Sequence, residues 1–205
     1  MEQVKAKIFL ADERGMNEAS WFRSFNTFNF GKYFNEHKFP IGDMYVMNDD
    51  SLDAGRSLRM MIEDLSYVIL LPVIGAIGYK DSSGNDDLIA AGQAKFIAVE
   101  KGETIEISNP FDDGLVNFLQ IWVKADKNEI IKGSHLSTYD VNECLNGLVT
   151  LSPESLGASI LPFSMSLGKF EGRGETNYRL RNKEAAIFLF VIEGAFEVQG
   201  RLLPV

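Results

Sequence analysis

A series of short apolar segments between residues 58 and 123 most constrains the fold of this chain. The segments are separated by turn-forming residues, as at Lys80–Asn85 and Glu100–Gly102, and they do not repeat apolar residues at the helical period. Short strands joined by Gly, Asp, Asn and Ser turns are typical of antiparallel barrels and sandwiches. The sequence therefore predicts an all-β fold, with strands at Leu58–Leu70, Leu88–Val99, Thr104–Ser108 and Val116–Val123.

The N-terminal part of the chain predicts two further strands, an aromatic plug and a polar loop. The strands are expected at Val4–Leu10 and Met44–Asn48. Between them, residues 21–34 are dense in aromatic side chains, which we expect to fill one end of a barrel because large rings are mostly buried. Asn48–Gly55 is rich in Asp and is predicted to be a solvated loop, since it lacks the ligand spacing of a calcium-binding EF-hand.

The second half of the chain continues the strand pattern. The corner at Gly194 echoes the one at Gly75, as two related barrels would show. The polar stretch Ala125–Ser137 is the expected linker, which divides the chain into a first domain at 1–125 and a second at 126–205. We expect the second barrel to be incomplete, with an open sheet edge that another segment or chain covers. Its strands are predicted at Gly147–Leu151, Ala158–Ser166, Thr176–Leu180, Ala186–Glu193 and Ala195–Gln199.

Composition excludes several classes of function and location. The chain has 205 residues and a formal net charge of −9, so a direct nucleic-acid partner is not expected, because phosphate binding needs a basic surface. The longest apolar run, Tyr67–Ile77, is too short to span a bilayer, and the N-terminus lacks the pattern of a signal peptide. Cys144 is the single cysteine, which excludes an intrachain disulfide and favours a reducing compartment. We therefore expect a cytoplasmic protein.

Several short motifs together resemble the pirin-like proteins. The aromatic segment Ser24–Phe34 is followed by Asn48-Asp-Asp, by the turn Asp81–Asn85, by Asn109-Pro and by Gln120-Ile-Trp-Val, in the order and at the spacing of that family. The resemblance covers about Trp21–Ala125 and is weaker afterwards. It implies a bicupin, two jelly-roll barrels in one chain. Several members bind a metal in the first barrel, some cleave quercetin as dioxygenases, and eukaryotic pirin acts as a transcription cofactor.

The residues that would hold the metal in this family are absent here. The resemblance implies three histidines and one glutamate as ligands, and alternation along a strand places residues two apart in the same cavity. The positions that match these ligands carry Ser57, Arg59, Ile105 and Ile107. The chain contains only two histidines, so a rearranged three-histidine site is excluded as well. We therefore predict no catalytic residue, no metal and no other cofactor.

Arg59 does not fit a simple apolar core. At the matched register its side chain points toward the former metal cavity, where an unpaired charge is costly. One interpretation is that Arg59 reaches the barrel mouth or pairs with Glu63 or Glu106. The alternative is that Arg59 replaces the positive charge of the metal and, with Ser57, binds a small anion such as a carboxylate.

The sequence thus favours a pirin-like protein that has lost its metal site. Such a protein acts in binding a small molecule, for example an anion, or in a regulatory protein interaction. A second copy or a partner protein covering the open C-terminal sheet edge is the expected macromolecular contact. The alternative is a metal-dependent quercetin 2,3-dioxygenase, which rests on the family resemblance alone.

Overall fold

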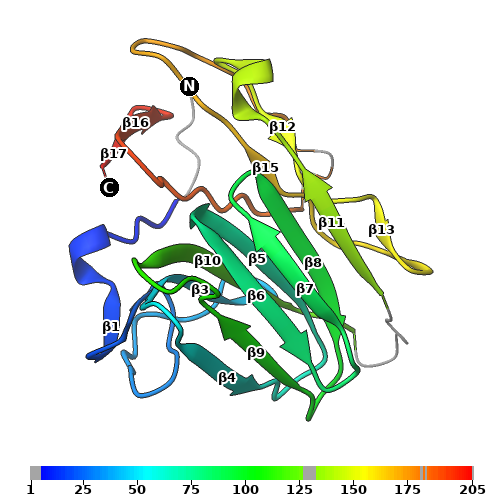
Figure 1. Cartoon of the computed structure of the whole chain (residues 1–205). Helices are drawn as coiled ribbons and strands as arrows, with labels where there is room; N and C mark the ends of the chain where they lie inside the picture. Colours follow the sequence, from blue (N-terminus) through cyan, green and yellow to red (C-terminus); the bar gives the residue numbers. More distant parts are fainter. Residues whose placement is uncertain (1–5, 127–132, 181, 183, 205) are drawn as a thin grey trace.

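The computed structural model describes residues 6–126, 133–180, 182 and 184–204, and its two largest sheets are antiparallel and face each other (Figure 1). The larger sheet has seven strands in the order β1-β2-β3-β10-β5-β8-β11, and the smaller has four in the order β4-β9-β6-β7. The all-β prediction is confirmed. The strands of the larger sheet are β1 (Gly15–Ala19), β2 (Phe22–Asn26), β3 (Met44–Leu52), β5 (Ser66–Ile74), β8 (Gln93–Val99), β10 (Val116–Lys124) and β11 (Ser134–Thr138). Those of the smaller sheet are β4 (Ser57–Met61), β6 (Ala76–Asp81), β7 (Asp86–Ala90) and β9 (Thr104–Ser108).

The two sheets enclose an apolar interior, and we call the unit that they form the barrel. One hydrophobic cluster joins the inner faces of both sheets. It includes Val68 and Phe118 from the larger sheet and Ile77, Ile105 and Ile107 from the smaller, all of which are fully buried. Because successive strand residues face opposite sides, these strands contribute every second residue to the interior.

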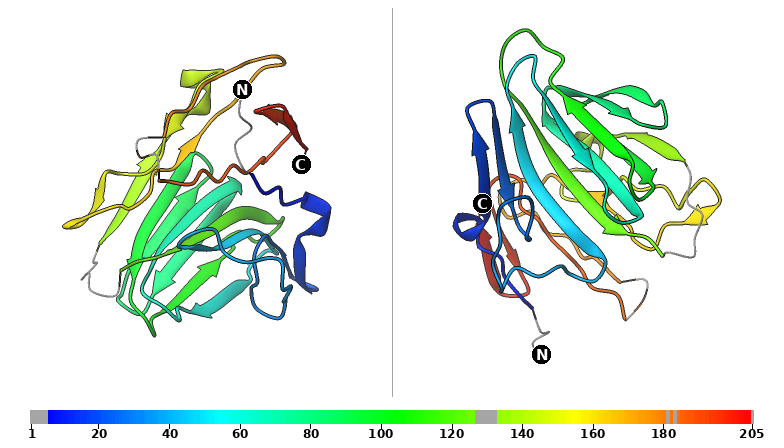
Figure 2. Two further views of the ribbon diagram at one scale, coloured as in Figure 1. Left: turned by 180° about the vertical axis from the view of Figure 1, so that it is seen from behind. Right: turned by 90° about the horizontal axis from the view of Figure 1, so that it is seen from below.

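The outer face of the larger sheet is also buried, because the second half of the chain packs on it (Figure 2). Strand β5 alternates between the two clusters, with Val68 and Leu70 inside the barrel and Ile69 and Leu71 on the outer face. A strand that is buried on both faces needs a continuous apolar sequence, and this explains the long apolar run of β5. The cover comes from Leu151, Leu156, Leu161, Phe163, Leu167, Phe188, Phe190 and Ile192.

The second half itself contains only short elements in the part that the structure describes. Strand β11 extends the larger sheet by pairing with β8, and Val141–Cys144 forms a 3₁₀ helix, η2. The remaining strands pair two by two and close no barrel among the described residues. The incomplete second barrel and the domain division at residue 125 therefore stay predictions. The pairs are β12 (Val149–Thr150) with β15 (Ser166–Leu167), β13 (Ser155–Leu156) with β14 (Ser159–Ile160), and β16 (Ala195–Val198) with β17 (Arg201–Pro204).

Several predicted elements are wrong. Residues 6–10 form no strand, and 11–13 form a 3₁₀ helix, η1, while residues 1–5 lie outside the described part. The predicted strand Leu58–Leu70 is two strands, because the chain crosses from one sheet to the other after β4, where Ile62 exchanges backbone hydrogen bonds with Gly102 and Glu103.

Part of the expected linker is a strand. Its residues 134–137 belong to β11, while 127–132 lie outside the described part. Neither 176–180 nor 186–193 pairs as a strand within the described chain.

The predicted aromatic plug is divided between three environments. Phe30 packs edge-on against Trp122 at the barrel interior, whereas Phe28 lies on the outer face against Phe9 and Phe188. Phe34 is 77% exposed. Only part of this segment therefore closes the barrel.

None of the helices in the described chain is long and apolar enough to cross a membrane. The cytoplasmic location stays a prediction.

Candidate functional site

The inner wall formed by β4 and β9 is apolar. Its register pairs Leu58 with Ile107 and Met60 with Ile105. Ile105 and Ile107 are fully buried, and the half-buried Met60 packs against the same cluster. Thus Ile105 and Ile107 do face the interior, as predicted, but the residues beside them on β4 are Leu58 and Met60.

The predicted inward orientation of Ser57 and Arg59 is wrong. Both are exposed on the outer face of the smaller sheet, one residue out of phase with the interior. The Arg59 side chain is 72% exposed and its Nη2 lies 2.5 Å from Glu106 Oε2, so the predicted pairing with Glu106 is formed outside the barrel. The Arg59 hydrogen bond is the main cause that lowers the pKa of Glu106, and Ser57 adds a second hydrogen bond. The structure therefore gathers Ser57 and Arg59 around a carboxylate of the chain itself.

The inner wall does not offer the ligands that a transition metal would need. Imidazole and carboxylate suit such a metal, whereas the four inward positions carry three aliphatic side chains and one thioether. No group of three His, Cys, Asp or Glu side chains with metal-binding geometry occurs among the described residues. His37 and His135 are both exposed, on a loop and on β11. The side chains of the β4–β9 wall thus do not fit the metal that the family resemblance implies.

The opposite inner wall is polar, which the sequence interpretation missed. Strand β3 runs through Asn48 and Asp50 to Leu52, so the predicted solvated loop at Asn48–Gly55 is wrong over most of its length. We call five side chains of this wall the polar row, all at most 1% exposed: Ser24 and Asn26 of β2, Asn48 and Asp50 of β3, and Gln120 of β10. The available signal was the alternation from Val46 to Leu52, in which two polar residues fall on the buried face.

Hydrogen bonds connect the polar row to the edge of the sheet. Asn17 of β1 donates to Asn26 Oδ1 at 2.6 Å, and Asn26 donates to Ser24 Oγ at 2.7 Å. Asp50 accepts hydrogen bonds from Ser24 and Gln120. The pKa of Asp50 is raised to about 7, chiefly by burial and to a smaller extent by the neighbouring Asp49, while the two hydrogen bonds lower it. Asp50 is therefore a carboxyl group that holds its proton far more readily than an ordinary one.

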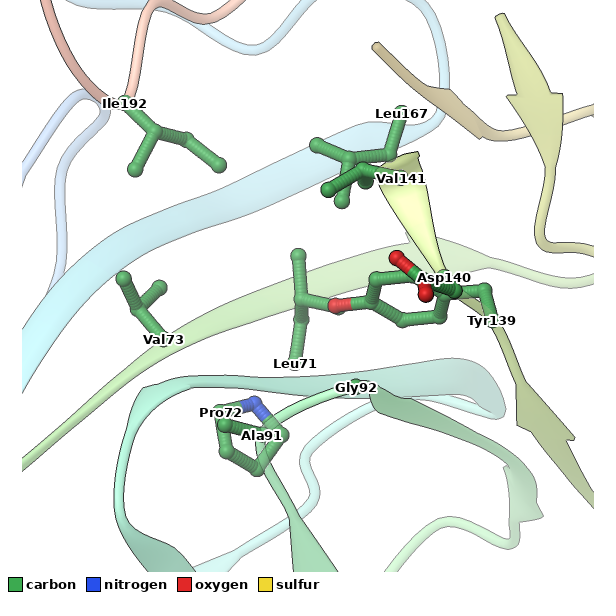
Figure 3. A pocket seen from close by; sticks show the side chains of 10 residues that line it. All are labelled: Leu71, Pro72, Val73, Ala91, Gly92, Tyr139, Asp140, Val141, Leu167 and Ile192. Atoms are coloured by element: carbon green, nitrogen blue, oxygen red, sulfur yellow. The ribbon is translucent and has the colours of Figure 1, made fainter. Parts of the chain in front are cut away.

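A cavity of about 270 Å³ lies outside the barrel, between the larger sheet and the second half of the chain (Figure 3). Its lining is mainly apolar, with the Tyr139 hydroxyl and the Asp140 carboxylate as the polar side-chain groups. The Asp140 side chain caps η2 by accepting from Asn142 N. The other lining residues are Leu71, Pro72, Val73, Ala91, Gly92, Val141, Leu167 and Ile192.

Comparison with known proteins places the barrel in a recognised group. The family model described as Pirin matches residues 10–123. A quercetin 2,3-dioxygenase of Escherichia coli K12 is 26% identical over 154 residues, which are 73% of this chain and 64% of that protein. The chain thus spans less than two thirds of the length of this curated relative.

Two solved structures from Escherichia coli show the same fold. The bacterial pirin YhhW in complex with nickel(II) superposes with a TM-score of 0.57 at 24% identity, covering 64% of this chain and 57% of that one. A second structure of YhhW gives a TM-score of 0.60 at 22% identity, covering 69% and 59%.

Proposed function

This chain belongs to the pirin family, and from that premise we propose that it is a non-catalytic member that binds a small molecule or a partner protein. The observation that carries the proposal is the apolar inner wall of β4 and β9. Leu58, Met60, Ile105 and Ile107 stand where the strand alternation would present ligands to the interior. A metal needs several nitrogen or oxygen donors, and these side chains supply none.

The outer cavity supports a small-molecule role. It is concave and mostly apolar with few polar groups, as ligand sites generally are. Its carboxylate, Asp140, can accept a hydrogen bond or face a positive charge, whereas an anion would be repelled. We propose a compact apolar ligand that carries a hydrogen-bond donor.

An anion site at Arg59 and Ser57 has less support than this cavity. Any anion there must compete with Glu106, which already accepts hydrogen bonds from both residues. The pair lies on an exposed surface, where charges are screened by water and salt.

The protein-binding role has its support in the second half of the chain. Ile160, Ile187, Leu189 and Leu202 are 80%, 54%, 46% and 68% exposed. These side chains are spread over the second half of the chain, from β14 to β17, and each exposes apolar area that a partner could cover. We propose a second copy or a partner protein as the cover of this region.

A metal-dependent quercetin 2,3-dioxygenase is the second candidate. The observation in its favour is the name of the Escherichia coli relative at 26% identity. That relative is longer than the matched region, and this chain would need donors that the wall of β4 and β9 does not present.

Metal content and oxygen uptake distinguish the two candidates. Untagged protein is passed over a gel-filtration column and analysed for iron, nickel, copper and manganese, and oxygen uptake is followed with quercetin. We expect no stoichiometric metal and no uptake above buffer. Stoichiometric metal together with uptake would restore the dioxygenase.

The cavity is tested separately, by thermal-shift screening of neutral and cationic apolar compounds. Val141→Trp fills the cavity and should abolish any stabilisation by a hit. Leu145→Trp is the matched control, because Leu145 is 42% exposed and does not line the cavity. Equal stabilisation of both variants would rule out the cavity as the binding site.

A further inference from the structure

The polar row contains more acceptors than donors. Within the described chain, Asn48 Oδ1, Asp50 Oδ1 and Gln120 Oε1 are buried without a hydrogen-bond partner. Asn48 Nδ2 is the one unpartnered donor of the row. A buried polar atom without a partner costs about 1–3 kcal/mol, so three such oxygens in one cluster call for an added donor.

No cation of the described chain supplies that donor. Asp49, the neighbour of Asp50, faces the outer side and pairs with Arg14 at 3.2 Å. On the inner face, Lys95 of β8 pairs with Asp87 of β7 at 3.0 Å. Opposite Asp50, β2 and β10 present Ser24 and Phe118.

The facing sheet adds no free charge either. Its buried Tyr79 donates to Asp81, and its other inward groups include the aliphatic Ile105 and Ile107. Arg23 of β2 pairs with Glu18 on the exposed side. Asp50 therefore has neutral partners only.

We infer that Asp50 is held as a neutral carboxylic acid, and that its ionisation releases the β1–β2 hairpin from the wall of the barrel. A proton on Asp50 Oδ1 supplies a donor to an amide oxygen of the polar row, and it also removes the unpaired charge. The raised pKa of Asp50 agrees with this assignment. The inference is independent of the proposed function, since it concerns neither a metal nor the outer cavity.

The hairpin meets β3 on the inner face through this network and through Phe22, which lies opposite Leu52 and packs against the inner cluster. In the register of the sheet, Ser24 lies opposite Asp50 and Asn26 lies opposite Asn48. The hairpin is the terminal part of the sheet, because β1 has β2 as its one neighbour. When Asp50 loses its proton, a carboxylate without a countercharge remains in the core, and the least costly response is to open this edge to water.

Nuclear magnetic resonance of the full chain tests whether ionisation of Asp50 opens the β1–β2 hairpin. The carboxyl carbon of Asp50 is followed between about pH 4 and pH 9, and we expect its transition near neutrality, well above the value of about 4 for an ordinary Asp. Amide hydrogen exchange is measured over the same range. Protection of residues in β1 and β2 should fall by about tenfold more than protection of β5 as Asp50 ionises.

Two variants complete the test: Asp50→Asn removes the titrating group itself, and Asp49→Asn removes the neighbouring carboxyl group as a control. Asp50→Asn keeps the shape without the titration and should hold the hairpin equally protected at every pH. Asp49→Asn removes the neighbouring carboxyl on the other face and should leave the pH-dependent opening in place. An Asp50 transition in the ordinary acidic range, or opening that persists in Asp50→Asn, overturns the inference. If Asp50→Asn does not fold, the titration of the unaltered protein still decides.

Discussion

The two inner walls of the barrel differ in polarity, since one is apolar and the other carries a buried network of polar side chains. The wall of β4 and β9 carries Leu58, Met60, Ile105 and Ile107, whereas the wall of β2, β3 and β10 carries the polar row. Both walls belong to the same barrel, one in its smaller sheet and the other in its larger sheet. The difference teaches that the fold fixes which positions face inward but leaves the chemistry of each wall open.

The apolar wall contributes packing energy alone, and the polar wall contributes a network whose balance depends on one proton. Well-packed aliphatic side chains stabilise at any pH, because they do not titrate. A buried polar network is stable only when all of its members are satisfied. Stability measurements can therefore separate the two walls.

The largest expected effect is a truncation in the apolar wall. Ile107 is fully buried, and Ile107→Ala should lower the free energy of unfolding by about 3–4 kcal/mol, because it removes buried methyl groups and leaves a cavity. The matched control is Ile74→Ala, since Ile74 is 62% exposed and should change stability by less than about 0.5 kcal/mol. Urea unfolding measures both. Similar losses in the two variants would mean that the apolar wall is not a packed core.

The polar wall should make stability fall as the pH rises toward neutrality. The pKa of Asp50 is raised to about 7 in the folded state, above the ordinary value of 3.8, so the folded protein binds more protons than the unfolded chain between these values. This contribution is fully present below the unfolded pKa and is lost as the pH rises through the folded one. Between about pH 5 and pH 8 the loss should be about 2–3 kcal/mol, which urea titrations at each pH would measure. A flat profile, or the same slope in Asp50→Asn, contradicts this assignment.

The elements that sequence could predict are those with local causes. The turn at 81–85 forms because Asp81 Oδ1 accepts from the backbone of Ser83 and Asn85. Strand Thr104–Ser108 was predicted with its exact bounds, since its alternation is regular and it follows a tight turn. Both features are decided within a few residues of chain.

The candidate site depended on longer-range facts that sequence did not supply. The predicted orientation of Ser57 and Arg59 came from matching this region to the ligand positions of the family, but the chain changes sheets between β4 and β5. A slip of one residue turns every side chain of a strand to the other face. The polar row was missed because Asp49 and Ser51 alternate with Asn48 and Asp50, so both faces of β3 look polar and the segment resembles a loop.

The smallest expected effect concerns Arg59, which lies on the outer face of β4, one of the two strands that form the apolar wall. Arg59→Ala should change the free energy of unfolding at neutral pH by less than about 0.5 kcal/mol, because the ion pair is exposed and screened. Its effect should instead appear on Glu106, whose pKa is lowered chiefly by Arg59 and should return toward the ordinary value in the variant. Since a lowered carboxyl pKa stabilises above the unfolded value and is lost as the pH falls through the folded one, the small difference between the two proteins should vanish in acid.

Titration with acetate tests whether Arg59 binds a small anion. Acetate added to the unaltered protein should leave the resonances of Arg59 unchanged, because Glu106 already occupies the guanidinium. In Glu106→Gln the same titration should shift them. Saturable binding of acetate to the unaltered protein would instead support the anion site, and would place the functional chemistry of this sheet on its outer face while its inner face serves packing.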